Sequence, residues 1–109
     1  MRSKSEVFID MALASNAIPY RYECELSLDN LTFYPDFTIM HPITRKLIYW
    51  EHLGMMDNAD YVNHNLHRLR DYENSGFRHG DNLIVTYETL KAPLDSRYID
   101  SVIKQYLLQ

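Results

Sequence analysis

Alternation of apolar and polar residues predicts three strands in the first half of the chain. Residues 20–28 place apolar side chains at every second position, and residues 31–40 and 46–55 also have strand character. Asp29 and Asn30 are predicted to turn the chain between the first two strands. The segment 42–45 is predicted to form the next turn, because Pro42 presets the backbone φ angle that a tight turn needs. These segments together predict an antiparallel meander.

Helical spacing of apolar residues predicts three helices around that meander. Ser3 or Ser5 can cap the first helix, the second spans about 58–74 and ends before Gly76, and the third follows Asp95. A short apolar strand at 82–88 separates the last two helices. This order predicts an α/β fold in one domain, 1–109, with a mixed sheet flanked by helices. The residues expected on the buried faces are Val7, Phe8, Met11, Ala12 and Leu13 in the first helix, and Val62, Leu66, Leu69 and Tyr72 in the second.

Two carboxylates are predicted to face each other across the second and third strands. If His41 pairs with Lys46 at the turn, the same register places Asp36 opposite Glu51. Like charges directly opposed in a ladder destabilise it, and a divalent cation bound by both carboxylates would offset this repulsion. Pro35 predicts a bulge or local distortion beside Asp36. The alternatives are a solvated acidic pair or a slipped register, and we favour the metal site.

Composition narrows the class of protein. The chain has 109 residues, is 46% hydrophobic and contains nine tyrosines, which indicates a globular fold. A single cysteine allows no internal disulfide and suits a reducing, cytoplasmic compartment. No segment is long and apolar enough to span a membrane. The net charge of -4 argues against non-specific binding of nucleic acid, although acids that bind a metal would contribute to that charge.

Histidines and the cysteine do not form a recognisable zinc motif. His64 and His67 are separated by three positions, whereas helical zinc-hydrolase motifs use two histidines separated by four with a glutamate between them. The lone Cys24 excludes a site with several thiolates. The acidic pair is therefore the main candidate for chemistry.

Three short motifs, in order, resemble those of the PD-(D/E)XK nucleases, the restriction-endonuclease-like phosphodiesterases. They are KSE at 4–6 in the first helix, YPDF at 34–37 and YWEHLG at 49–54. The phrases at 18–23 and 50–54 are similar to nuclease-like modules attached to some bacterial DNA helicases. The resemblance covers nearly the whole chain and implies an α-β-β-β-α-β core followed by a C-terminal helix. Because the chain starts almost within the first motif, we expect it to be a piece of a longer protein.

The resemblance implies hydrolysis of DNA phosphodiester bonds with Mg²⁺ or Mn²⁺ as cofactor. Asp36 and Glu51 would be metal ligands, and Glu6 would reach the same ion from the first helix, directly or through a metal-bound water. For Glu6 alone, an ordinary carboxylate stabilised by the helix dipole is an equal alternative. Glu23 would have an accessory role at most, since a solvated charge is the simpler interpretation.

The chain departs from the family pattern at Leu53, where the motif lysine is expected. Leucine cannot position the water or neutralise phosphate charge. Substitute cations are Lys4, Arg68 and His52, although strand alternation directs His52 to the opposite face. Arg68 is predicted to share a helix face with Tyr61, Asn65 and Tyr72, and the Arg68–Tyr72 combination is similar to a helix motif of some family members. The alternative for Arg68 is a surface cation.

Two functions follow from these motifs, and the sequence leaves enzymatic activity open. The retained acids favour a metal-dependent DNA endonuclease. The missing lysine favours a catalytically impaired nuclease-fold module that binds DNA or a partner protein. A structural protein unrelated to nucleic acid has only the negative net charge in its favour.

Overall fold

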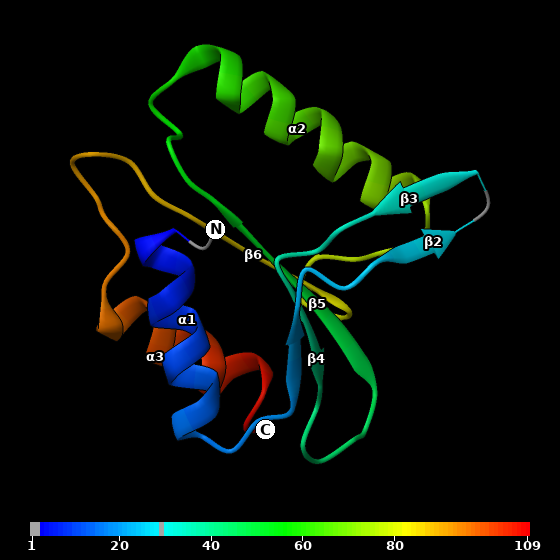
Figure 1. Cartoon of the computed structure of the whole chain (residues 1–109), viewed down its shortest axis with the longest axis vertical. Helices are drawn as coiled ribbons and strands as arrows, with labels where there is room; N and C mark the ends of the chain where they lie inside the picture. Colours follow the sequence, from blue (N-terminus) through cyan, green and yellow to red (C-terminus); the bar gives the residue numbers. More distant parts are fainter. Residues whose placement is uncertain (1–2, 29) are drawn as a thin grey trace.

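A four-stranded mixed sheet lies between helices on its two faces in the computed structural model, which describes residues 3–28 and 30–109 (Figure 1). The strand order is β1-β4-β5-β6. The β1–β4 and β4–β5 pairs are antiparallel, and β5–β6 is parallel because helix α2 carries the chain between them. The predicted α/β class and mixed sheet are confirmed. The elements are α1 (Lys4–Ser15), β1 (Tyr20–Tyr22), β2 (Leu26–Leu28), β3 (Leu31–Phe33), β4 (Phe37–Met40), β5 (Leu47–Leu53), α2 (Ala59–Asn74), β6 (Leu83–Tyr87) and α3 (Ser96–Tyr106).

Each of the first two predicted strands is divided into two pieces. The inner pieces, β1 and β4, belong to the main sheet, whereas β2 and β3 form a separate hairpin that projects from it (Figure 1). Pro35 lies at the break between β3 and β4, where it has no N–H to donate to a ladder. Glu23 lies at the matching break between β1 and β2, with a left-handed φ of 49°. Asp29 of the predicted turn lies outside the described residues.

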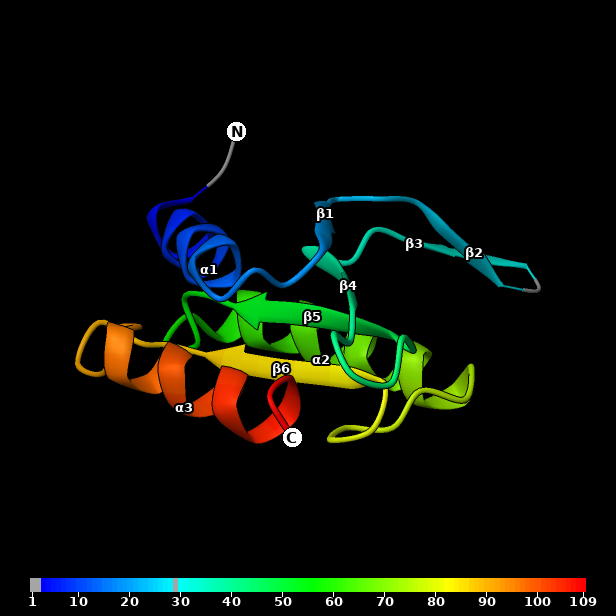
Figure 2. The same cartoon turned by 90° about the horizontal axis from the view of Figure 1, so that it is seen from below.

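The sheet separates two hydrophobic cores. One core packs α1 and α3 against the face that carries Phe37, Trp50 and Ile84. The other joins α2 and the β2–β3 hairpin to the opposite face, where Phe33 stacks on Tyr72 with ring centroids 4.4 Å apart. Figure 2 shows α3 and α2 separated by strands β5 and β6.

The predicted buried stripes of two helices are wrong in part. In α1 the fully buried side chains are Ile9 and Leu13, whereas Val7, Phe8 and Met11 are exposed. In α2, Leu66 is exposed and the buried residues are Asn65 and Tyr72, with Arg68 half-buried beside them. The inner face of α2 packs over the buried carboxylate of Glu51 on the sheet. This face therefore carries polar side chains, which a search for apolar residues at helical spacing does not identify.

Side-chain caps fix where the helices begin. The Ser3 side chain accepts a hydrogen bond from the backbone N–H of Glu6, so Ser3 rather than Ser5 caps α1. Asn58 and Asp95 cap α2 and α3 in the same way. Helix α2 ends before Gly76, as the sequence predicted. Gly76 has a φ of 95°, which is favourable for glycine. Within residues 3–28 and 30–109, no helix has the length and apolar character needed to cross a membrane.

Candidate active site

Strands β4 and β5 pair in the predicted register. Phe37 lies opposite Trp50 and Ile39 opposite Ile48. At the turn the backbone N–H of His41 donates to the carbonyl oxygen of Lys46 at 2.9 Å. One position beyond Phe37 and Trp50, this register brings Asp36 opposite Glu51.

Where Pro35 interrupts the ladder, the two carboxylates accept the backbone hydrogen bonds. The N–H of Asp36 donates to Oε1 of Glu51 at 3.2 Å, and the N–H of His52 donates to Oδ2 of Asp36 at 2.7 Å. Each acid therefore holds the backbone beside the other, which fixes both side chains on the edge of the broken strand pair. The two carboxylates lie together, as the sequence predicted.

Glu51 is fully buried and is contacted by polar side chains of α2. The hydroxyl of Tyr72 donates to Oε1 at 3.0 Å. Nη2 of Arg68 lies 2.8 Å from Oε2 and also donates to Oδ1 of Asn65 at 3.3 Å. Despite this short ion pair, Oε2 has no hydrogen bond of acceptable geometry, and neither has Nε of Arg68. A buried carboxylate oxygen thus keeps unused bonding capacity.

Burial and mutual repulsion disfavour the charged forms of both acids. Burial, which is the largest influence, and the charge of Asp36 together raise the pKa of Glu51 to about 7, although Arg68 and Tyr72 act in the opposite direction. Burial also raises the pKa of Asp36 to about 6, against the lowering effect of the His52 N–H. Arg68 therefore compensates only part of the cost of two buried carboxylates.

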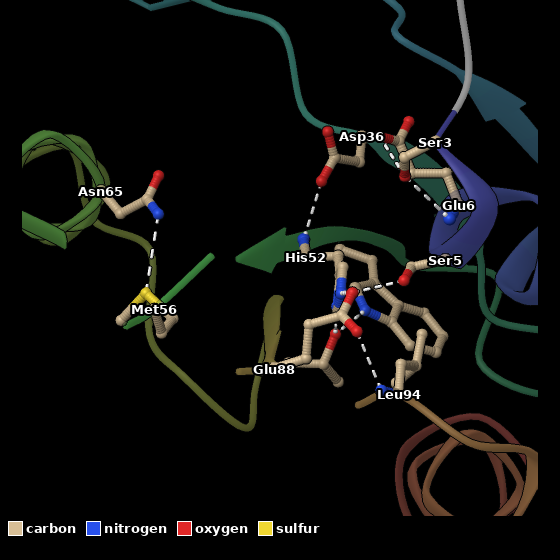
Figure 3. A network of polar contacts seen from close by, with 11 residues as sticks. Ser3, Ser5, Glu6, Asp36, His52, Met56, Asn65, Glu88 and Leu94 are labelled. Atoms are coloured by element: carbon tan, nitrogen blue, oxygen red, sulfur yellow. Dashed lines mark hydrogen bonds and ion pairs between the residues drawn. The ribbon is translucent and has the colours of Figure 1, made fainter. Parts of the chain in front are cut away.

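Glu6 reaches the neighbourhood of Asp36 from the N-terminus of α1 (Figure 3). Its charge contributes to the raised pKa of Asp36. The carboxylate accepts hydrogen bonds from Ser3 Oγ at 3.1 Å and from the Tyr22 hydroxyl. Glu23 also lies near that hydroxyl. Burial, together with the nearby carboxylates of Glu6 and Glu23, raises the pKa of Tyr22. Glu6 therefore lies near Asp36, and Glu23 lies beside Tyr22.

The carboxylate oxygens of Asp36 and Glu51 are ligands that suit a hard divalent cation, but a third acid among the described residues does not join them. Among residues 3–28 and 30–109, no group of three His, Cys, Asp or Glu side chains could hold a metal ion. The expected cluster of Asp36, Glu51 and Glu6 is thus not assembled, because Glu6 bonds to Ser3 and Tyr22. Mg²⁺ needs only one or two protein carboxylates, and the buried, incompletely bonded Oε2 of Glu51 suits this role.

Of the three predicted substitute cations, Arg68 is the one whose cationic group contacts the acid pair, whereas His52 contacts Asp36 through its backbone N–H. The alternative of a solvated surface cation is wrong for Arg68, since it pairs with buried Glu51. Lys4 is exposed, with Nζ 5.9 Å from the centre of the Phe8 ring, and lines a cavity of about 450 Å³ together with Glu6 and His52. The ring of His52 lies on the opposite face of the sheet from Glu51, as strand alternation predicted. Leu53 is buried and only 2% exposed.

Polar residues around His52 were missed by sequence reasoning. Thr86 and Glu88 hold the two ring nitrogens of His52, and Ser5 donates to the carboxylate of Glu88. The available signal was Thr86, a polar residue within the apolar strand 82–88. Such a residue in a buried strand needs a hydrogen-bond partner.

Comparisons with protein-family models, curated proteins and solved structures found no significant match to this chain. The nuclease resemblance therefore depends on the three motifs and on the geometry of the acid pair.

Proposed function

We propose that the chain hydrolyses DNA phosphodiester bonds with Mg²⁺ or Mn²⁺, at the site formed by Asp36 and Glu51. The observation that carries this proposal is the buried Glu51 carboxylate, which lies beside a second acid and whose Oε2 is paired with Arg68 but has no hydrogen bond of acceptable geometry. A purely structural residue at this position would avoid the cost of two neighbouring buried carboxylates. A divalent cation would offset that cost by neutralising both charges.

When bound, the metal ion would activate a water molecule and stabilise the negative charge of the phosphate. Asp36 and Glu51 would hold it. The Tyr72 hydroxyl and the N–H of Asp36 orient the Glu51 carboxylate from its Oε1 side, which leaves Oε2 for the metal. The backbone N–H of His52 orients Asp36 in the same manner. The restriction-endonuclease-like core and the DNA substrate are part of this proposal.

Arg68 is the substitute we propose for the lysine that Leu53 replaces. Its guanidinium lies 2.8 Å from Oε2 of Glu51, the oxygen that a metal would use. A metal ion and Arg68 would therefore compete for this oxygen. Once released, the half-buried guanidinium can donate to phosphate oxygens in a bidentate geometry. Lys4 lines the cavity that also contains Glu6 and His52, and would at most guide the DNA backbone.

Plasmid nicking tests this proposal. We expect the wild-type protein to nick DNA with Mn²⁺ or Mg²⁺ and not with EDTA, and Glu51→Gln to abolish nicking. Arg68→Ala should lower the rate by about 10²-fold, the scale of losing one charge-stabilising group, without preventing metal binding. Arg70→Ala is the matched control, because Arg70 is an exposed cation on the same helix. Nicking that survives Glu51→Gln would place the activity elsewhere.

The second candidate is a catalytically impaired module that binds DNA or a partner protein. Buried Leu53 favours it, because no cation can act from that position. Wild-type protein that binds DNA but does not nick it with either metal would support this module over the enzyme.

A further inference from the structure

A connected set of polar side chains lies on the opposite face of the sheet from Glu51. The His52 network consists of Ser5, Trp50, His52, Thr86 and Glu88 (Figure 3). The imidazole of His52 is 3% exposed and the side chain of Glu88 19% exposed, while Thr86 is fully buried. Such burial makes each hydrogen bond costly to lose.

One order of donors satisfies every member of this network. The indole N–H of Trp50, which can only donate, donates to Oγ1 of Thr86 at 2.9 Å. The Thr86 hydroxyl then donates to Nδ1 of His52 at 2.7 Å, and Nε2–H of His52 donates to Oε1 of Glu88 at 2.8 Å. The Ser5 hydroxyl donates to the same carboxylate oxygen. This order fixes the ring of His52 by both nitrogens.

The network links α1 to the strand that carries the acid pair. Ser5 precedes Glu6 in the first turn of α1, and His52 follows Glu51 in β5. Glu88 joins the two, and its position is fixed by its own N–H, which donates to the Leu53 carbonyl at 3.0 Å. Its Oε2 accepts from the backbone N–H of Leu94 at 2.9 Å. On the other side, the His52 backbone N–H holds Asp36.

We propose that His52 is a positioning residue, which uses its network to hold the first turn of α1, and with it Glu6, in the neighbourhood of Asp36. This inference rests on the proposed metal-dependent function. Direct hydrogen-bond partners of metal ligands typically change metal affinity or activity by about 10- to 100-fold when removed. The His52 ring acts through Glu88 and Ser5, so its effect should lie at the lower end of that range. The link through Ser5 fixes the position of Glu6, although Glu6 itself is not in contact with Glu51.

Two substitutions of His52 separate positioning from general stability. Asparagine reaches only as far as Nδ1 and can bond to Thr86, whereas glutamine reaches as far as Nε2 and can bond to Glu88. Both lose one buried hydrogen bond, so we expect similar decreases in melting temperature. Calorimetric titration with Mn²⁺ should show weakening by about 10-fold in His52→Asn, and by no more than about threefold in His52→Gln, which keeps the link to Glu88.

Further variants show whether the effect passes through α1. In a Glu6→Gln background, His52→Asn should add little to the loss of Mn²⁺ affinity, because coupled residues are not additive. Ser5→Ala cuts the same link at a half-buried position and should weaken Mn²⁺ binding even if His52→Asn does not fold. His41→Ala is the matched control: this buried histidine holds the β4–β5 turn, so it should lower stability without changing Mn²⁺ affinity.

The inference is overturned if the Asn and Gln variants bind Mn²⁺ equally well, or if the loss is undiminished in the Glu6→Gln background. It is also overturned if Ser5→Ala binds Mn²⁺ like the wild-type protein. A wild-type protein that binds no Mn²⁺ would overturn the proposed function and this inference together. Wild-type binding followed by equal behaviour of the variants would overturn the positioning role alone.

Discussion

Replacing Arg68 by methionine removes the cation beside buried Glu51 and keeps most of the apolar stem. In the wild-type protein Glu51 has a pKa of about 7, so above pH 7 it is ionised in both the folded and the unfolded state. Without Arg68 the pKa rises further, and the folded variant retains a proton that the unfolded chain has lost. The stability of the variant must therefore decrease as the pH rises.

The size of this effect is limited by protonation. A buried carboxylate that loses its partner can take up a proton, and this costs about 1.4 kcal/mol for each pH unit above its original pKa. The penalty from Arg68→Met should thus be near zero at pH 6 and rise to about 3 kcal/mol at pH 9. An unrelieved buried charge would instead cost about 3–5 kcal/mol.

Urea unfolding in EDTA at pH 6 and pH 9 measures this difference. Arg70→Met, an exposed substitution on the same helix, should show no pH-dependent penalty. If Arg68→Met loses the same stability at both pH values, the loss comes from packing, and our account of Glu51 as a partly compensated buried charge is refuted.

Two further predictions concern the stability that the acid pair and its partners give to the protein. Metal at 100 times its dissociation constant should stabilise the protein by about 2.7 kcal/mol, or roughly 10 °C in a thermal melt, and an unchanged melting temperature would count against a metal site. Tyr72→Phe removes a hydroxyl that donates to a buried carboxylate and should cost about 1–3 kcal/mol at pH 8 by urea unfolding; a loss below the error of the measurement would show that Tyr72 does not stabilise the charge of Glu51.

The part of the site that depends on local signals was predictable. Pro42 and the alternation on either side of it specify a short turn, and that turn determines the register that places Asp36 opposite Glu51. Pro35 correctly indicated a disturbed strand. The sequence did not show that the disturbance divides the strands and forms a separate β2–β3 hairpin, because the backbone conformation of Glu23 at the matching break has no clear sequence signal.

Contacts between distant segments were harder to predict. The inner face of α2 carries Asn65 and Arg68 because it packs over a buried carboxylate, so the apolar spacing wrongly favoured Leu66. The hydrogen bonds from His52 to Thr86 and Glu88 join residues more than thirty positions apart. Their pairing depends on the parallel alignment of β5 and β6, which the hydrophobic pattern does not specify.

Calorimetric titration of Mn²⁺ into the EDTA-treated and dialysed protein tests the central claim most directly. We predict that the wild-type chain binds one ion at the acid pair, and that Asp36→Asn and Glu51→Gln each remove this binding. Asp71→Asn, an acid on α2 outside the pair, should bind Mn²⁺ like the wild-type protein. Wild-type protein without a binding heat, or unchanged binding in Asp36→Asn and Glu51→Gln, would contradict a metal site at Asp36 and Glu51.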